Sequence, residues 1–227
     1  MKKTAILLTG SAGFIGSNLS RYFLNKNKIV LGIDNFKIVE KKNIKYILKN
    51  KNFFFKKLYL SDYNKINSCL KKFTQKYKIE SIWHLAANSD IKDGFKDPDN
   101  DYKNTFLTTY NLIKISKKYR IQNFVFASSS AIYGNLKDTR LSENSGPLLP
   151  ISTYGAMKLA SEGIISAAKE SFLKKAFIFR LPNVVGFPST HGVIHDFINR
   201  LKKNPKKLMV LGNGKQKKIY MHVQDLI

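Results

Sequence analysis

The chain has 227 residues, which is enough for one large core with a small appendage. A single cysteine, Cys69, excludes an internal disulfide, and no apolar run reaches the length of a membrane span. A net charge of +25 is typical of nucleic-acid-binding proteins. However, only five of the 40 basic residues are arginine, and the lysines are scattered along the chain instead of forming one basic segment. We therefore expect a cytoplasmic protein with neither a nucleic-acid nor a membrane partner, whose positive field attracts an anionic substrate.

Short apolar runs alternate with amphipathic segments along the chain. The runs predict buried strands at Ala5–Thr9, Ile29–Ile33, Phe53–Leu58, Ser81–Leu85, Asn123–Ala127 and Ala176–Arg180. The amphipathic segments predict helices near Ile15–Lys26, Tyr63–Lys76, Tyr102–Tyr119 and Tyr154–Ser171. This alternation is typical of an α/β, Rossmann-type doubly wound parallel sheet, which we assign to residues 1–182. Shorter elements with Gly and Pro predict the start of a small substrate lobe over residues 183–227.

A turn with three glycines joins the first predicted strand to the first helix. Gly10 permits the tight turn, Gly13 lets the backbone approach a pyrophosphate, and Gly16 permits close packing of helix on strand. The first turn of the helix, with Phe14 and Ile15, presents free N–H groups and the positive end of its dipole to the phosphates. The sequence therefore predicts a dinucleotide at this turn.

Carboxylates follow the second and third predicted strands. Asp34 ends the second strand, where a carboxylate accepts hydrogen bonds from a ribose 2′-hydroxyl and repels a 2′-phosphate. This favours NAD over NADP, and Asn35 is assigned to the same cofactor site. Asp62, after the third strand, is predicted to contact the adenine.

Tyr154 and Lys158 are four residues apart and therefore share one face of a helix. An ammonium group near a tyrosine stabilises the phenolate and lowers its pKa, which makes Tyr154 a base near neutral pH. Ser130, after the fifth strand, is predicted to hydrogen-bond the substrate oxygen from which Tyr154 would take a proton. No cluster of His, Asp and Glu predicts a metal site, and the four histidines are interpreted as scaffold or surface residues.

The ordered set of motifs resembles the extended short-chain dehydrogenase/reductases of the NAD-dependent epimerase/dehydratase family, in particular those like UDP-glucose 4-epimerase. The resemblance rests on TGSAGFIG (9–16), HLAA (84–87), FASSSAIYG (126–134), YGAMK (154–158), RLPN (180–183) and HVQDL (222–226). It covers essentially the whole chain and is more specific for the family than for the reaction.

The resemblance implies a role for each matching residue. Tyr154 would be the acid/base, Lys158 would bind the nicotinamide ribose, and Ser130 would orient the sugar hydroxyl. Asn183 matches a position that contacts the phosphate of a nucleotide-sugar, and Asn104 matches a recurring structural Asn. The residues that would line the cofactor are Leu85, Ala86, Ala87 and Ser128.

The loop after the predicted catalytic serine separates the reactions known in the family. Related dehydratases and decarboxylases carry a glutamate there, whereas this chain has Ala131-Ile132, as UDP-glucose 4-epimerases do. The resemblance therefore implies C4 epimerisation of a UDP-hexose through a transient 4-keto sugar. Two alternatives stay open, a dehydratase or reductase on the same scaffold and a catalytically weak NAD-binding fragment.

The chain departs from the family pattern in two places. Lys217-Lys218 occupy the region where epimerases carry an arginine, and a lysine supplies charge without a bidentate fork. Family members continue well past the HVQDL motif, so we expect part of the substrate lobe to lie beyond Ile227. Residues 190–198 resemble the segment that covers the nucleotide. The family usually pairs into homodimers, here through the helices at Tyr102–Tyr119 and Tyr154–Ser171.

Overall fold

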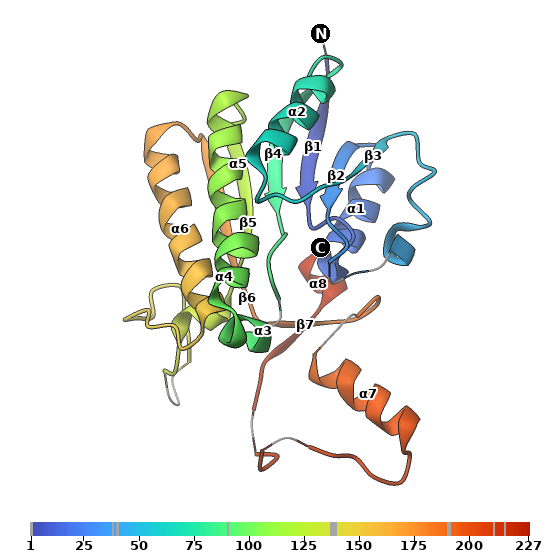
Figure 1. The fold of residues 1–227 in the computed structure, drawn as a ribbon, viewed down its shortest axis with the longest axis vertical. Helices are drawn as coiled ribbons and strands as arrows, with labels where there is room; N and C mark the ends of the chain where they lie inside the picture. Colours follow the sequence, from blue (N-terminus) through green and yellow to red (C-terminus); the bar gives the residue numbers. More distant parts are fainter. Residues whose placement is uncertain are drawn as a thin grey trace.

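A computed structural model describes residues 2–37, 39, 41–89, 91–136, 140–189, 192–210, 212–215 and 217–227. Its main feature is a six-stranded parallel sheet with the strand order β3-β2-β1-β4-β5-β6 (Figure 1). The strands are β1 (Lys3–Thr9), β2 (Ile29–Asp34), β3 (Phe53–Lys57), β4 (Tyr77–His84), β5 (Asn123–Ser129) and β6 (Lys175–Leu181). The predicted doubly wound sheet is confirmed, and each predicted strand overlaps an observed one.

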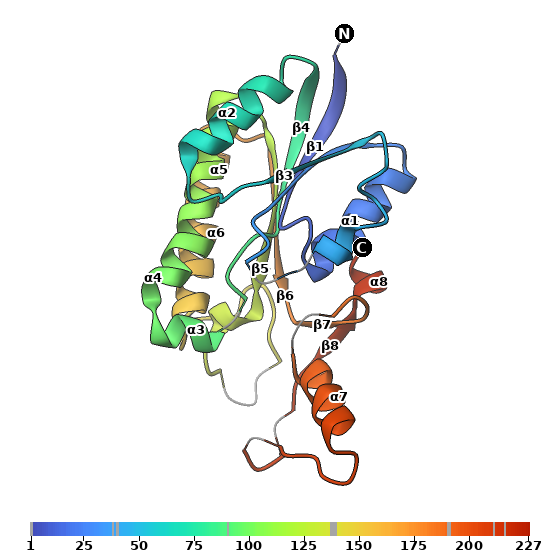
Figure 2. The same ribbon diagram turned by 45° about the vertical axis from the view of Figure 1, so that its right-hand side comes forward.

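Helices cover the two faces of the sheet unequally. The helices α2 (Tyr63–Phe73), α5 (Leu107–Lys118) and α6 (Thr153–Ser171) lie on one face, and α1 (Phe14–Asn25) lies on the other (Figure 2). Each layer has its own apolar core, with Leu70, Leu112 and Ile165 in the first and Leu19 and Phe23 in the second. Strands buried between two such layers read as continuous apolar runs, which is why the sequence pattern located them.

Two helices begin at side-chain caps that the sequence carries. The Asp62 carboxylate accepts a hydrogen bond from the Lys65 N–H at the start of α2, and the Ser152 hydroxyl accepts one from the Gly155 N–H at the start of α6. These caps satisfy first-turn N–H groups that have no partner within their helices. The cap at Ser152 thereby sets the start of the helix that bears Tyr154 and Lys158.

The predicted helix at Tyr102–Tyr119 is divided in the structure. It begins as a π-helix, η2 (Tyr102–Phe106), and continues as α5. Two short helices that the sequence pattern did not indicate precede it, α3 (Ile91–Lys96) and α4 (Pro98–Asp101). Short 3-10 helices, η1 (Lys41–Ile44) and η3 (Ser130–Tyr133), follow β2 and β5.

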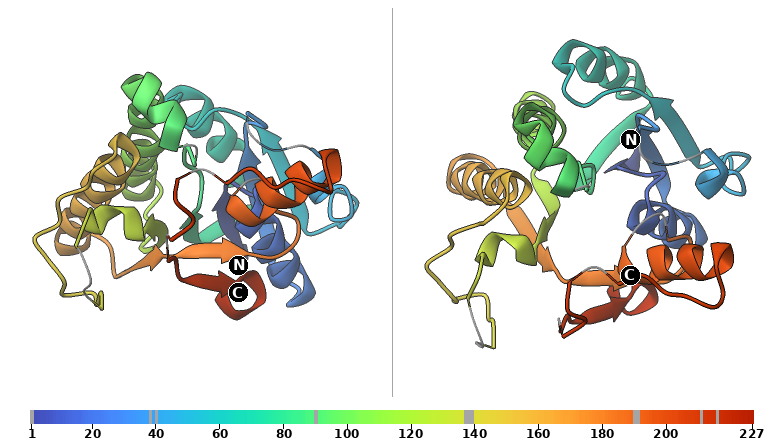
Figure 3. Two further views of the ribbon diagram at one scale, coloured as in Figure 1. Left: turned by 90° about the horizontal axis from the view of Figure 1, so that it is seen from below. Right: turned by 60° about the horizontal axis from the view of Figure 1, so that its bottom comes forward.

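The segment after residue 182 lies across the carboxyl ends of the strands (Figure 3). Its strands β7 (Asn183–Val185) and β8 (Tyr220–His222) pair in parallel, and between them runs α7 (Val193–Lys203), which has no buried residue. The last helix, α8 (Val223–Leu226), returns toward α1, where Ile227 packs against the second core (Figure 1). Within the described residues, no helix has the length and apolarity that crossing a membrane requires.

Candidate functional site

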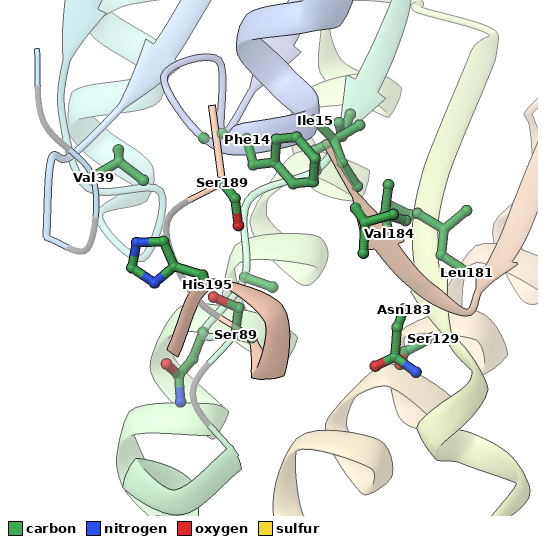
Figure 4. A pocket seen from close by; sticks show the side chains of 18 of the residues that line it. Phe14, Ile15, Val39, Ser89, Ser129, Leu181, Asn183, Val184, Ser189 and His195 are labelled. Carbon is green, nitrogen blue, oxygen red and sulfur yellow. The ribbon is translucent and has the colours of Figure 1, made fainter. Parts of the chain in front are cut away.

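A cavity of about 1310 Å³ opens at the carboxyl ends of the parallel strands. Its walls come from the glycine turn, the ends of β2, β4 and β5, the start of α6, and α7. Figure 4 shows Ser129 and Asn183 on one side of this cavity and Ser89 and His195 on the other. Open parallel sheets bind ligands at this edge, so the fold and the cavity identify the same place.

The glycine turn is shaped by backbone contacts that exclude any side chain. Gly10 has φ +65°, and a Cβ added there would lie 2.8 Å from the Ala86 nitrogen. A Cβ at Gly16 would lie 2.0 Å from the Gly10 carbonyl oxygen. Both residues line the cavity with Gly13, Phe14 and Ile15. The helix that follows has no side-chain cap, so its first N–H groups are available to an anion.

Asp34 closes the β2 end of the cavity. Its carboxylate accepts hydrogen bonds from the Ala12 N–H at 3.0 Å and from the Phe36 N–H at 2.9 Å. Burial raises the pKa of Asp34, and these backbone donors oppose the shift. Asn35 lines the cavity beside it. The carboxylate is therefore fixed by the backbone next to the glycine turn, where the sequence predicted it.

Tyr154, Lys158 and Ser129 meet at the opposite end of the cavity. All three line it, with Ser129 at the end of β5 and the other two residues in α6. The Lys158 ammonium donates to the Ala127 carbonyl oxygen and lies 5.8 Å from the centre of the Tyr154 ring. A phenol, an amine and a hydroxyl group therefore line one space, and the sequence predicted this position for the first two.

The serine in this group is Ser129 rather than the predicted Ser130. The strand β5 ends at Ser129, whose hydroxyl also accepts a hydrogen bond from the Ala131 N–H at the start of η3. Ser130 begins that 3-10 helix, its side chain is exposed, and it is not part of the cavity wall. The chain turns from β5 into η3 between these two serines, so the side chain of Ser130 leaves the direction that the strand end gives to Ser129.

The pKa values of Tyr154 and Lys158 differ from the expectation that a charged lysine lowers the pKa of the tyrosine. Burial raises the pKa of Tyr154 to about 12; the Ser129 hydrogen bond lowers it and the charge of Asp101 raises it. Burial lowers the pKa of Lys158 to about 7, and the charge of Glu162 opposes that shift. Burial therefore favours the neutral form of both side chains, the phenol of Tyr154 and the amine of Lys158.

Asp62 lies outside the cavity, so the structure does not support its predicted contact with adenine. Its carboxylate caps α2 and lies 3.1 Å from the Lys65 ammonium. The Lys65 backbone N–H lowers the pKa of Asp62 more than any other group. The other predicted cofactor residues Leu85, Ala86, Ala87 and Ser128 line the cavity, and so does Asn183.

The structure adds residues that sequence reasoning missed. Lys37 reaches from the loop after β2 to the Asn100 side-chain oxygen, at 2.7 Å, and both residues line the cavity. Asn104, expected to be structural, donates to the same Asn100 oxygen and also lines the cavity. Further lining residues that were missed are Leu58, Leu60, Asn88 and Ser89. The position of Asn88 and Ser89 directly after the HLAA motif was the available signal.

Histidines take no part in a metal site within the described residues, where no group of three or more His, Cys, Asp and Glu side chains comes together. His195 lines the cavity with its ring 3.7 Å from Asp196. Thr190 and His191 of the expected nucleotide-covering segment lie outside the described residues. The rest of that segment, from Gly192 to Ile198, lines the cavity.

Comparison with known proteins gives a consistent family. The sequence model of the NAD dependent epimerase/dehydratase family matches residues 6–227. A dTDP-D-glucose 4,6-dehydratase of Dictyostelium discoideum is 30% identical over 98% of this chain. The chain spans 53% of the length of that relative.

Two solved structures of 4-epimerases have the same fold. The UDP-glucose 4-epimerase of Thermotoga maritima, with UDP-glucose, superimposes with a TM-score of 0.86 at 28% identity, over 98% of this chain and 70% of its own. The UDP-glucuronic acid 4-epimerase of Bacillus cereus, with UDP-glucuronic acid and NAD, gives a TM-score of 0.84 at 28% identity, with the same coverage.

Proposed function

Because this chain belongs to the NAD-dependent epimerase/dehydratase family, we propose that it binds NAD and epimerises C4 of a UDP-hexose. The observation that carries the proposal is the meeting of Tyr154, Lys158 and Ser129 in one cavity with the glycine turn. Tyr154, Lys158 and Ser129 would handle a proton, the glycine turn would hold a dinucleotide, and both parts of the site face the same cavity.

The residues present fit NAD. The side-chain-free turn at Gly10 and Gly16 and the uncapped start of α1 provide backbone donors for a pyrophosphate. Asp34 would accept from the ribose hydroxyls, and its charge would repel a 2′-phosphate. Lys158 would donate to the nicotinamide ribose at the other end of the cavity. NAD, when bound there, would take a hydride from C4 of the sugar and return it to the opposite face.

The protein residues would manage the proton and the geometry. Tyr154 would take the proton of the C4 hydroxyl as the hydride leaves and would return it when the hydride comes back. Since burial raises its pKa to about 12, Tyr154 needs a nearby positive charge to act as a base, and Lys158 would supply it. Ser129 would hydrogen-bond the same sugar oxygen and hold it beside Tyr154.

The substrate would extend from this point toward the small lobe. Asn183 also lines the cavity and would contact the diphosphate of the nucleotide. Lys218, on the segment leading to β8, also lines the cavity and would supply positive charge there. On this proposal residues 1–182 hold the cofactor and residues 183–227 begin the nucleotide-sugar lobe.

Dehydration of a nucleotide-sugar is the second candidate, because the Dictyostelium discoideum relative is a 4,6-dehydratase. Dehydration needs an additional acid/base near the catalytic hydroxyl group. Ser130 and Ala131 follow Ser129, and neither is acidic. Among the described lining residues only Asp34 and Asp196 are acidic, and neither belongs to the Tyr154 group. This composition favours epimerisation.

The test is incubation of the purified chain with NAD and UDP-glucose, followed by chromatography for UDP-galactose. The substitution Tyr154→Phe removes the acid/base, so we expect at least a hundredfold loss of product, on the order of what general acid–base catalysis contributes. NAD should raise the melting temperature of both proteins. Loss of water or net reduction of NAD would contradict epimerisation in favour of the alternatives, and absence of an NAD effect would contradict the cofactor site.

The proposal includes a homodimer paired through α5 and α6. These helices lie next to each other on one side of the molecule (Figure 1). Tyr110 of α5 is 46% exposed, so this surface has an aromatic side chain available for contact.

A further inference from the structure

A buried carboxylate lies behind the Tyr154 group. Glu162 follows Tyr154 and Lys158 at intervals of four residues, so the three share one face of α6. Glu162 is only 7% exposed. Burying a carboxylate is costly unless it is paired and hydrogen-bonded, and the reaction proposed above assigns Glu162 no role.

The partners of Glu162 come from the strands β5 and β6. The Ser128 hydroxyl donates to its Oε1 atom, and the Arg180 guanidinium donates from Nε at 3.2 Å and from Nη2 at 2.9 Å to its Oε2 atom. Ser128 directly precedes Ser129 on β5. Arg180 directly precedes Leu181, which lines the cavity. One carboxylate therefore connects the helix bearing Tyr154 to the ends of β5 and β6.

The remaining guanidinium nitrogen extends the network to the loop after Ser129. Arg180 Nη1 donates to the Tyr133 hydroxyl at 3.1 Å and to the Glu143 carbonyl oxygen at 2.8 Å. Tyr133 belongs to η3, the 3-10 helix that starts immediately after Ser129. The segment carrying Ser129 is thus held on both sides, through Ser128 before it and through Tyr133 after it.

We propose that Glu162 is a positioning residue, which holds Ser129 in register with Tyr154 and keeps Lys158 cationic. The first part follows from the contact to Ser128, and the second from the spacing of Glu162 and Lys158 on one helix face. The catalytic part of this inference rests on the function proposed above, whereas the effect on the charge of Lys158 concerns only NAD binding.

The charge of Lys158 is finely balanced among the groups around it. Burial lowers its pKa to about 7, and Glu162 opposes this shift. His84 of β4 also contacts the Phe126 ring over which the Lys158 ammonium lies, and burial lowers the pKa of His84 well below its ordinary value. Asp101 of α4 acts on Tyr154, and Arg180 partly neutralises Glu162 itself. Removal of the Glu162 charge should therefore shift the loss of the lysine proton to lower pH.

Two substitutions separate charge from geometry. Glu162→Gln keeps the length of the side chain and removes its charge, whereas Glu162→Asp keeps the charge and shortens the reach to Ser128. Glu170→Gln is the matched control, because Glu170 is an exposed residue of the same helix. The dissociation constant for NAD is measured from about pH 6 to 9, together with kcat and KM for the UDP-sugar.

A charged donor binds ribose hydroxyls more strongly than a neutral one, so NAD affinity should fall as Lys158 loses its proton. In Glu162→Gln we expect NAD affinity to fall at a lower pH than in wild type. In Glu170→Gln and in Glu162→Asp we expect it to fall at the same pH as in wild type. Both Glu162 variants should lose roughly tenfold in kcat with little change in KM, because the displaced serine acts on the reacting oxygen.

An NAD titration of Glu162→Gln that matches Glu170→Gln, or a wild-type affinity independent of pH, would overturn the electrostatic role. An unchanged kcat in Glu162→Asp would overturn the positioning role, and it decides that role even where Glu162→Gln fails to fold. Wild-type protein that binds NAD without converting any UDP-sugar would contradict the proposed function and with it the positioning role. The NAD titrations would still decide the role in the charge of Lys158.

Discussion

At the scale of single residues, His84 is a histidine whose two ring nitrogens both contact hydroxyl groups. It is fully buried at the end of β4, where its Nδ1 lies 2.7 Å from the Thr9 hydroxyl and its Nε2 lies 3.0 Å from the Thr109 hydroxyl. Thr109 donates its own proton to the Thr105 carbonyl oxygen, so it accepts from the histidine. Burial favours the neutral ring, and with its proton on Nε2 the neutral ring accepts from the Thr9 hydroxyl at Nδ1.

This arrangement predicts acid sensitivity. Burial first and the charge of Lys158 second lower the pKa of His84 well below its ordinary value of 6.5. Below about pH 6.5, this histidine binds a proton in the unfolded chain but stays neutral in the folded chain. The free energy of unfolding should therefore decrease as pH falls, by up to about 1.4 kcal/mol per pH unit from this residue. The measurement is urea unfolding of wild type and His84→Gln between about pH 7 and 5.

The comparison concerns the slope against pH, because His84→Gln also changes the stability at neutral pH. His222→Asn is the control, since His222 is exposed and asparagine preserves a cap at the start of α8. We expect a flatter slope for His84→Gln and the wild-type slope for His222→Asn. Parallel slopes for all three proteins would show that His84 titrates alike in the folded and unfolded chains.

At the scale of elements, the end of β5 decides which serine takes part in the proposed chemistry. Ser128 lines the cavity and donates to Glu162, Ser129 lines the cavity and accepts from the Ala131 N–H, and Ser130 is exposed, so the three serines have three different environments. We expect Ser129→Ala to lower kcat about a hundredfold, because it removes a donor to the reacting oxygen. Ser130→Ala should stay close to wild type. The assay is UDP-hexose epimerisation with NAD saturating, and equal losses in the two variants would contradict this assignment.

The same element shows where sequence reasoning ends. The parallel strands were predictable because burial on both faces leaves continuous apolar runs, and the glycine turn because only glycine fits the contacts at Gly10 and Gly16. The sequence pattern does not distinguish three adjacent serines. Which of them lies beside Tyr154 depends on the residue at which β5 ends and η3 begins. Asp62 shows a related ambiguity, because a carboxylate after a strand is as suitable for the helix cap that it forms here as for a ligand.

Glu162 and the short helices before α5 illustrate contacts that no local pattern encodes. Arg180 and Glu162 are 18 residues apart and meet only because β6 lies beside α6 at the sheet edge. The helices α3 and α4 are too short for an apolar period, yet α4 brings Asn100 to the cavity wall. Positions of this kind depend on tertiary packing, so they became visible only with the fold.

At the scale of the whole molecule, the dominant property is a net charge of +25, because basic residues far outnumber acidic ones. The chain has 40 basic and 15 acidic residues, and exposed pairs such as Lys103 with Asp99 contribute little. Such an excess of one sign strains the folded state through self-repulsion, and the same field attracts anionic ligands. NAD and UDP-sugars are anions, so one feature of the composition opposes folding and favours binding.

Salt should therefore move stability and ligand affinity in opposite directions. At 0.1 M salt, exposed charges more than about 10 Å apart are largely screened from each other. This screening relieves the repulsion among surface lysines and weakens the attraction of anionic ligands. Between about 20 and 300 mM NaCl we expect the melting temperature to rise by roughly 2–4 °C per kcal/mol relieved, while the dissociation constant for NAD increases. Potassium glutamate at equal ionic strength is the control for specific chloride binding. A melting temperature that falls with both salts would mean that attractive pairs outweigh the repulsion among the lysines.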